Sequence, residues 1–193
     1  FKSSSIDQQT AHLAQRRSAL AVNIDKLPAN VVAAETDALK RFEELHKATK
    51  EGLTNDPISW VRKTGVYEAP PLDWTPASIQ HRIETAEAIA KQYGVAPKYL
   101  DEGEREKLAQ QLKAGGAPML GMLGGMYQSF GPRMLTVMGE ISKQAPEAAT
   151  IGWMVASGNH NQQTIADAAA GLEMQQKRAL GVEKLPEIKR ADG

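Results

Sequence analysis

The sequence contains no cysteine, and this absence excludes several kinds of chemistry at once. A chain without thiols has no disulfide framework, no thiolate zinc site and no cysteine nucleophile. Aromatic residues make up only 5% of the chain, and alanine supplies much of the 41% apolar content. Small side chains with few rings suit close helix packing better than a β-sandwich.

An excess of either charge is also missing. The 23 Lys and Arg residues balance the 23 Asp and Glu residues, whereas nucleic-acid-binding domains usually carry a basic excess. We therefore expect no nucleic-acid partner. Long hydrophobic runs are lacking as well, because the most apolar stretch, residues 117–127, is about half of the roughly 20 residues that a membrane span needs. Contact with a membrane is an alternative that this length does not favour.

Signals for β-strands are nearly absent, and signals for helix ends are frequent. They predict an all-α protein, in which a long N-terminal helical hairpin is followed by a multi-helix bundle of shorter helices. The hairpin combines helices over about 5–26 and 29–51, with Gly52 as the cap of the second. Asp56-Pro57 and Thr75-Pro76 open further helices. The remaining helices are expected at about 101–113, 118–130, 132–144, 146–157 and 161–180.

These elements suggest a division into a helical hairpin arm (1–53), a linker with helices (54–116), a compact helical bundle (117–181) and a polar tail (182–193). Residues 54–181 are expected to form one domain. The chain starts at Phe1 rather than Met, as expected of a processed protein or a piece of a longer polypeptide.

The predicted hairpin carries the candidate interaction surface. Ile6, Leu13 and Leu20 recur every seven residues, while Thr10, Arg17 and Ile24, four positions after each, are mostly polar. Only half of a coiled-coil seam is visible, so these side chains need another surface to cover them. Helix 29–51 adds apolar residues on one face. The predicted surface comprises Ile6, Leu13, Leu20, Val32, Leu39 and Phe42.

The apolar stretch "PMLGMLGGMY" does not match a phosphate-binding loop, because its glycine spacing is wrong and no strand precedes it. Helical spacing predicts one buried stripe, packed against the helices that hold Met134, Met138 and Trp153. Gly121 and Gly125 fall on another face, where a second helix could approach closely. An exposed partner surface is the alternative for this Met-rich region. The predicted stripe consists of Met119, Met122, Leu123, Met126 and Phe130.

No set of residues has the spacing of a catalytic, cofactor-binding or metal site. The four histidines are far apart, so each is interpreted as a residue of a helix face rather than a ligand: His12, His46, His81 and His160. The segment "GGMYQ" faintly echoes a sequence box of helical lytic transglycosylases. These enzymes also need a glutamate, usually followed by serine, and no Glu-Ser pair occurs in this chain. We therefore expect no enzymatic activity and no cofactor.

Two segments resemble parts of large virion-associated proteins of tailed bacteriophages and prophages. The first is "NDPISWVRKTG" followed by "PPLDW", and the second begins at "MGEISKQAPEAATIGW" and runs to Leu172. In the second, Glu140-Ile141, Ala145-Pro146 and the segment 168–171 match recurring features of the group. The resemblance covers about residues 55–173. It implies an internal virion, ejection or tail-associated component, and some such proteins carry a peptidoglycan-cleaving domain elsewhere.

The resulting expectation is a non-enzymatic structural or assembly module of a virion protein, which acts through helix-mediated contacts. Its expected partners are copies of itself or other virion chains, and its expected location is the virion or the bacterial cytoplasm during assembly. Two alternatives remain from the sequence: an accessory domain of a cell-wall hydrolase, and a membrane-interacting ejection component.

Overall fold

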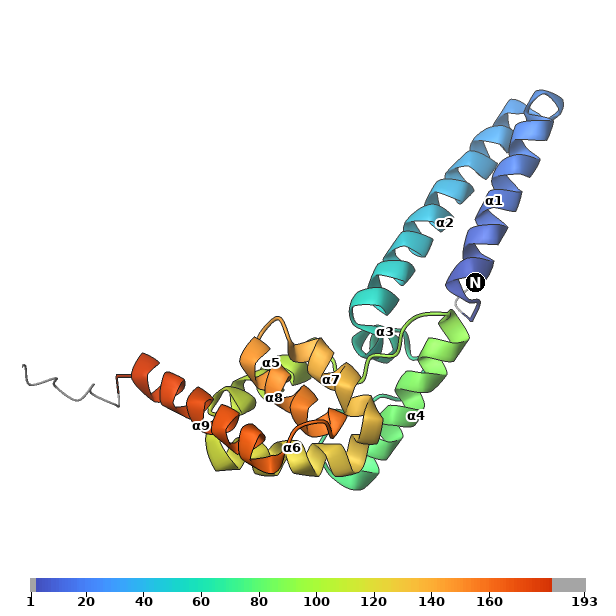
Figure 1. Cartoon of the computed structure of the whole chain (residues 1–193). Helices are drawn as coiled ribbons and strands as arrows, with labels where there is room; N and C mark the ends of the chain where they lie inside the picture. Colours follow the sequence, from blue (N-terminus) through green and yellow to red (C-terminus); the bar gives the residue numbers. More distant parts are fainter. Residues whose placement is uncertain (1–2, 182–193) are drawn as a thin grey trace, which may run out of the picture. The chain divides into compact units, whose positions relative to one another are not determined.

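The computed structural model describes residues 3–181, and over this range the protein is all-α, with no β-strand (Figure 1). A long N-terminal helical hairpin is followed by shorter packed helices, which confirms the predicted fold class. The α-helices are α1 (Ile6–Asn23), α2 (Ala29–Asn55), α3 (Pro57–Thr64), α4 (Pro76–Tyr93), α5 (Glu102–Lys113), α6 (Gly116–Phe130), α7 (Met134–Ile141), α8 (Pro146–Ser157) and α9 (Gln162–Ala179). Two 3-10 turns, η1 (Ile24–Lys26) and η2 (Gly131–Arg133), precede α2 and α7.

Local capping explains most of the helix ends. Ser5 and Gln8 form a capping box at the start of α1, and the Thr75 side chain accepts a hydrogen bond from the Ser78 amide before Pro76 opens α4. Gly94 ends α4 in the left-handed conformation that glycine adopts without a steric penalty. The neighbouring Asp73 carboxylate accepts hydrogen bonds from the hydroxyl and amide of Thr75, which lower its pKa.

One predicted helix end is wrong. Gly52 does not cap α2, which continues to Asn55. A Cβ built on Gly52 would lie 2.3 Å from Cδ1 of Trp60, so this position is glycine because the indole ring of α3 packs directly on the α2 backbone. Trp60 also meets Tyr93 edge to face, with ring centroids 5.4 Å apart, and burial raises the pKa of that tyrosine.

The chain divides into two compact units between Glu102 and Gly103. This division falls inside the range 54–181, which was expected to form one domain, and differs from the predicted boundaries after residues 53 and 116. The physical reason is that α3 packs against both α2 and α4, so the segment that follows the hairpin shares its core. The predicted polar tail, residues 182–193, lies outside the described residues.

In the second unit, α7 packs on α8, and α6 packs on both α8 and α9. The apolar stripe of α6 is largely buried, as the helical spacing predicts, but it comprises Met119, Leu123, Met126 and Phe130. Met122 is only half-buried, because it lies beside this stripe rather than in it. The buried residues follow the spacing i, i+4, i+7 and i+11, which is the same helical period as the predicted stripe without its i+3 position.

The predicted close approach of a helix to Gly121 and Gly125 of α6 is wrong. A Cβ on Gly121, Gly124 or Gly125 would meet no atom within 4 Å. A close approach occurs instead at Gly152 of α8, where a Cβ would lie 2.1 Å from Sδ of Met138. Trp153, the next residue of α8, is 38% exposed and therefore lies at the edge of the core.

Two truncations on α6 separate these positions. We expect Leu123→Ala to lower the free energy of unfolding by about 2–5 kcal/mol, because Leu123 is fully buried and a cavity would remain. Met122→Ala should cost about 1 kcal/mol or less, since its side chain is already partly in water. Urea unfolding of both variants measures the difference. Equal losses would contradict the stripe as the structure defines it.

A candidate interaction surface on the helical arm

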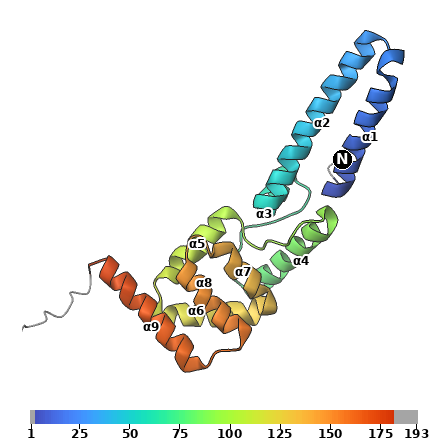
Figure 2. The ribbon, with the colours of Figure 1, turned by 45° about the horizontal axis from the view of Figure 1, so that its top comes forward.

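The arm is the antiparallel pair α1 and α2, which lie side by side in both views (Figure 2). Residues with reduced exposure recur at alternating intervals of three and four on each helix, which is the spacing of a coiled-coil seam. On α1 the seam consists of Ile6, Gln9, Leu13, Arg16, Leu20 and Asn23. On α2 it consists of Val32, Glu35, Leu39, Phe42, His46, Thr49 and Leu53.

Polar residues occupy the α1 seam positions between the apolar ones. Gln9 is 1% exposed, and its Oε1 lies 3.1 Å from Nδ1 of His46. Arg16 forms an ion pair with Glu35 at 2.6 Å and lies over the ring of Phe42, 5.0 Å from its centroid. Gln9 and Arg16 thus each meet a matching side chain on α2, whereas Asn23 donates to the carbonyl of Ala19 in its own helix. Polar layers of this kind fix the register of paired helices.

The predicted interaction surface therefore lies mostly inside the arm. Ile6, Leu13 and Leu39 are buried, and Leu20, Val32 and Phe42 are half-buried. The sequence argument took the residues four positions after each apolar residue as the other half of the seam. In the structure the residues three positions after each apolar residue complete the seam, and Gln9 and Arg16 among them contact side chains of α2. The six predicted residues therefore do not form an open surface.

A different stripe of α2 is largely open to solvent, with Ala38 half-buried. It follows the same three-four spacing as the seam, one position earlier, and its side chains are small or apolar except for one arginine. We call it the α2 stripe: Val31, Ala34, Ala38, Arg41, Leu45 and Ala48. Val31 is 37% exposed and Leu45 is 42% exposed. The opposite edge of the arm instead carries the Arg17–Glu43 ion pair.

A hollow of about 350 Å³ lies at the end of the α2 stripe, near the turn of the hairpin. Apolar and polar side chains of both helices and the turn line it: Ala19, Leu20, Leu27 and Val31, together with Arg16, Asn23 and Glu35. Val22, beside it on α1, is 72% exposed, and Ile24 of the turn is 48% exposed. This end of the arm therefore combines a partly apolar hollow with protruding apolar side chains, which is typical of an interaction site.

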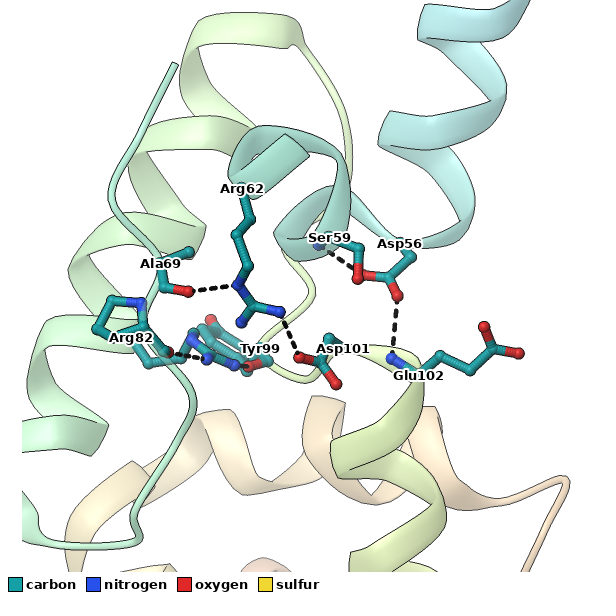
Figure 3. Close-up of polar contacts among 9 residues, drawn as sticks. Asp56, Ser59, Arg62, Ala69, Arg82, Tyr99, Asp101 and Glu102 are labelled. Atoms are coloured by element: carbon teal, nitrogen blue, oxygen red, sulfur yellow. Dashed lines mark hydrogen bonds and ion pairs between the residues drawn. The ribbon is translucent and has the colours of Figure 1, made fainter. Parts of the chain in front are cut away.

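A polar cluster at the base of the first unit is a second candidate (Figure 3). The buried Arg82 donates hydrogen bonds to the carbonyl oxygens of Pro70 and Tyr99, both at 2.8 Å. Arg62 donates to the carbonyl of Ala69 at 2.7 Å and pairs with Asp101 at 3.0 Å. These guanidinium groups bind main-chain oxygens of the non-helical segments 65–75 and 94–101. The cluster of Arg62, Arg82 and Asp101 therefore holds those segments in place, and we call it the clasp.

Asp56 extends this clasp. One carboxylate oxygen accepts a hydrogen bond from the amide of Ser59 at the start of α3, at 3.0 Å. The other accepts a hydrogen bond from the amide of Glu102 at 2.9 Å. A single side chain thus caps two helix starts, an arrangement that the predicted Asp56-Pro57 signal captured only for α3.

The structure places the other residues considered from the sequence on separate surfaces. His12, His81 and His160 are exposed, and His46 lies in the seam between Gln9 and Thr10. The segment "GGMYQ" lies on α6, where Met126 is buried. Among residues 3–181 no group of His, Asp and Glu side chains is arranged to hold a metal ion. Over the same range, no helix combines the length and apolar character that crossing a bilayer requires.

Comparison with known proteins finds no match: no protein-family model fits the sequence, and no curated protein or solved structure is significantly similar to it.

Proposed function

We propose that this chain is a non-enzymatic assembly module of a tailed-phage or prophage virion protein, which acts through helix-mediated contacts between protein chains. The observation that carries the proposal is the gathering of exposed apolar side chains on the arm. Exposed apolar side chains that gather on one element often mark a binding site. The exposed large apolar residues of the arm are Val22, Ile24, Leu27, Val31 and Leu45.

The arm also has the physical properties of a docking element. Its seam is closed by internal apolar and polar layers, so α1 and α2 need no further protein to satisfy the side chains between them. The exposed stripe is thus additional apolar surface, held on a preformed helix that loses little conformational freedom on binding. The resemblance of about residues 55–173 to virion-associated proteins supplies the proposed biological setting, a virion or the bacterial cytoplasm during assembly.

Two neighbouring alanines test the proposal. Ala33 and Ala34 are both exposed on α2, but only Ala34 lies on the α2 stripe. We expect the full chain to associate with itself or with other virion chains, and Ala34→Asp to weaken that association because it places a charge in an apolar contact. Ala33→Asp is the matched control and should associate like the unaltered chain. Light scattering and co-purification from infected cells measure both.

A strictly monomeric chain that co-purifies with no virion component would contradict this function. The same conclusion would follow if Ala33→Asp and Ala34→Asp behaved alike. The virion setting has its own test, because genes for portal, capsid or tail proteins are expected beside the gene for this chain.

A further inference from the structure

The length, the small side chains and the shape of the α2 stripe indicate which kind of partner could cover it. Its apolar positions run from Val31 to Ala48, a span of about 26 Å along the helix axis. Three alanines along it allow another helix to approach closely, at an interaxial distance near the lower end of about 8–10 Å. Leu45 protrudes from one half of the stripe, and the hollow beside Val31 lies at the other end. A protrusion and a hollow on one surface make that surface complementary to a copy of itself when the copy is reversed.

We infer that two copies of this chain pair through the α2 stripe, with their α2 helices antiparallel and with Ala38 at the two-fold axis. This inference rests on the proposed function, because it assigns the binding surface of the arm to a second copy. In this arrangement Val31 faces Leu45 of the second copy, and Leu45 fills the hollow that Val31 lines. Ala34 faces Arg41 of the second copy, and the two Ala38 residues meet.

Charge complementarity favours the antiparallel direction. Arg41 is the single charged residue of the α2 stripe, and a parallel pair would place the two Arg41 side chains next to each other. In the antiparallel pair, Arg41 lies over Ala34 of the second copy, one turn from the exposed Asp37. A guanidinium can reach that carboxylate across the edge of the contact. Acidic and basic residues also balance over 6–55, so two arms do not repel each other overall.

The α2 stripe is continuous with an interface that the chain already forms. The next position in its three-four spacing after Ala48 is Gly52, and the ring of Trp60 packs on that glycine. At this end of the stripe, the face of α2 is therefore already covered by the Trp60 side chain. The second copy extends the same packing along the part of the stripe that the chain leaves exposed.

Cysteine cross-linking tests the geometry directly, because the chain has no native cysteine. Ala38→Cys should form a disulfide-linked dimer under mild oxidation, since residues at a two-fold axis meet their own copies. Val31→Cys and Leu45→Cys should cross-link poorly alone but efficiently when the two variants are mixed. Ala33→Cys, on another face, is the control and should stay monomeric on denaturing gels. Self-linkage of Val31→Cys with none of Ala38→Cys would overturn the antiparallel pairing.

Charge reversal tests the same pairing in solution. Arg41→Asp and Asp37→Arg should each raise the Kd of self-association by about tenfold or more, measured by sedimentation across a range of protein concentrations. The double variant R41D/D37R should recover most of the affinity, because it exchanges the two charges. Circular dichroism checks that all three keep the helix content of the unaltered chain. No recovery in the double variant would overturn the Arg41–Asp37 contact on which the direction depends.

The two proposals fail in different ways. If the chain stays monomeric at every concentration while Ala34→Asp, but not Ala33→Asp, loses a virion partner, the second copy is wrong and the proposed function stands. If neither self-association nor a partner is found, both are wrong.

Discussion

Gly115→Ala is expected to lower the stability of the second unit by about 3 kcal/mol or more, the combined effect of backbone strain and overpacking. Gly115 has φ 68° and ψ −163°, a region that is nearly exclusive to glycine. A Cβ at this position would also lie 2.5 Å from the backbone nitrogen and 2.9 Å from Cα of Glu173 on α9. Backbone atoms cannot move aside as a side-chain end can, so α9 would have to separate from the start of α6.

Gly158→Ala is the matched control. Gly158 has φ 67°, but a Cβ there would meet no atom within 4 Å, so only the backbone strain of about 1–2 kcal/mol is expected. Hydrogen exchange followed by mass spectrometry distinguishes the variants by segment. Gly115→Ala should remove protection from α6 and α9 and leave α1 and α2 protected. A stability loss no larger than that of Gly158→Ala would show that α9 does not hold this contact.

Arg82→Ala should be the most damaging single change in the first unit, with a loss of about 3–5 kcal/mol. The Arg82 side chain is 2% exposed, and its guanidinium donates to two main-chain oxygens from two different non-helical segments. Truncation removes both donors and also leaves a cavity. Buried carbonyl oxygens without donors carry the full cost of their lost hydration, which exceeds the net value of the hydrogen bonds.

Three further variants apportion this loss in urea unfolding. Arg82→Met retains most of the side-chain volume, so its difference from Arg82→Ala measures the cavity. Arg82→Lys keeps the charge without the planar fork that reaches two oxygens, and should remain clearly destabilised. Arg62→Ala should cost about 1 kcal/mol, because the Arg62 side chain is 38% exposed and water replaces its partners. Equal effects of Arg62→Ala and Arg82→Ala would contradict the clasp as a buried structure.

Helix positions follow closely from short-range signals. Asp56-Pro57 and Thr75-Pro76 act within one turn of the chain, and the structure starts α3 and α4 where they occur. Gly94, in the left-handed conformation, ends α4 by the same kind of local signal. Gly52 fails as a signal because its role depends on Trp60, a residue of another helix. A glycine that ends a helix and a glycine that admits a neighbouring ring look alike in sequence.

The sequence predicted which element carries the candidate surface, but not which residues form it. The arm was expected to carry it, and the three-four spacing of Val31, Ala34 and Ala38 was a usable signal for a second stripe. The six predicted residues were instead taken up by the seam. Which half of a heptad is internal depends on the partner helix, and here Gln9 and Arg16 enter the seam only because His46 and Glu35 lie opposite them.

Composition, capping and periodicity thus settle that the protein is all-α, where its helices lie and that it begins with a hairpin, because these properties depend on residues within a few positions of each other. Tertiary structure decides the rest. It places the division at Glu102, puts close helix contacts at Gly115 and Gly152 rather than at Gly121, and leaves most of the α2 stripe exposed. Each of these depends on side chains that are distant in sequence and meet only when the helices pack, so no local pattern contains them.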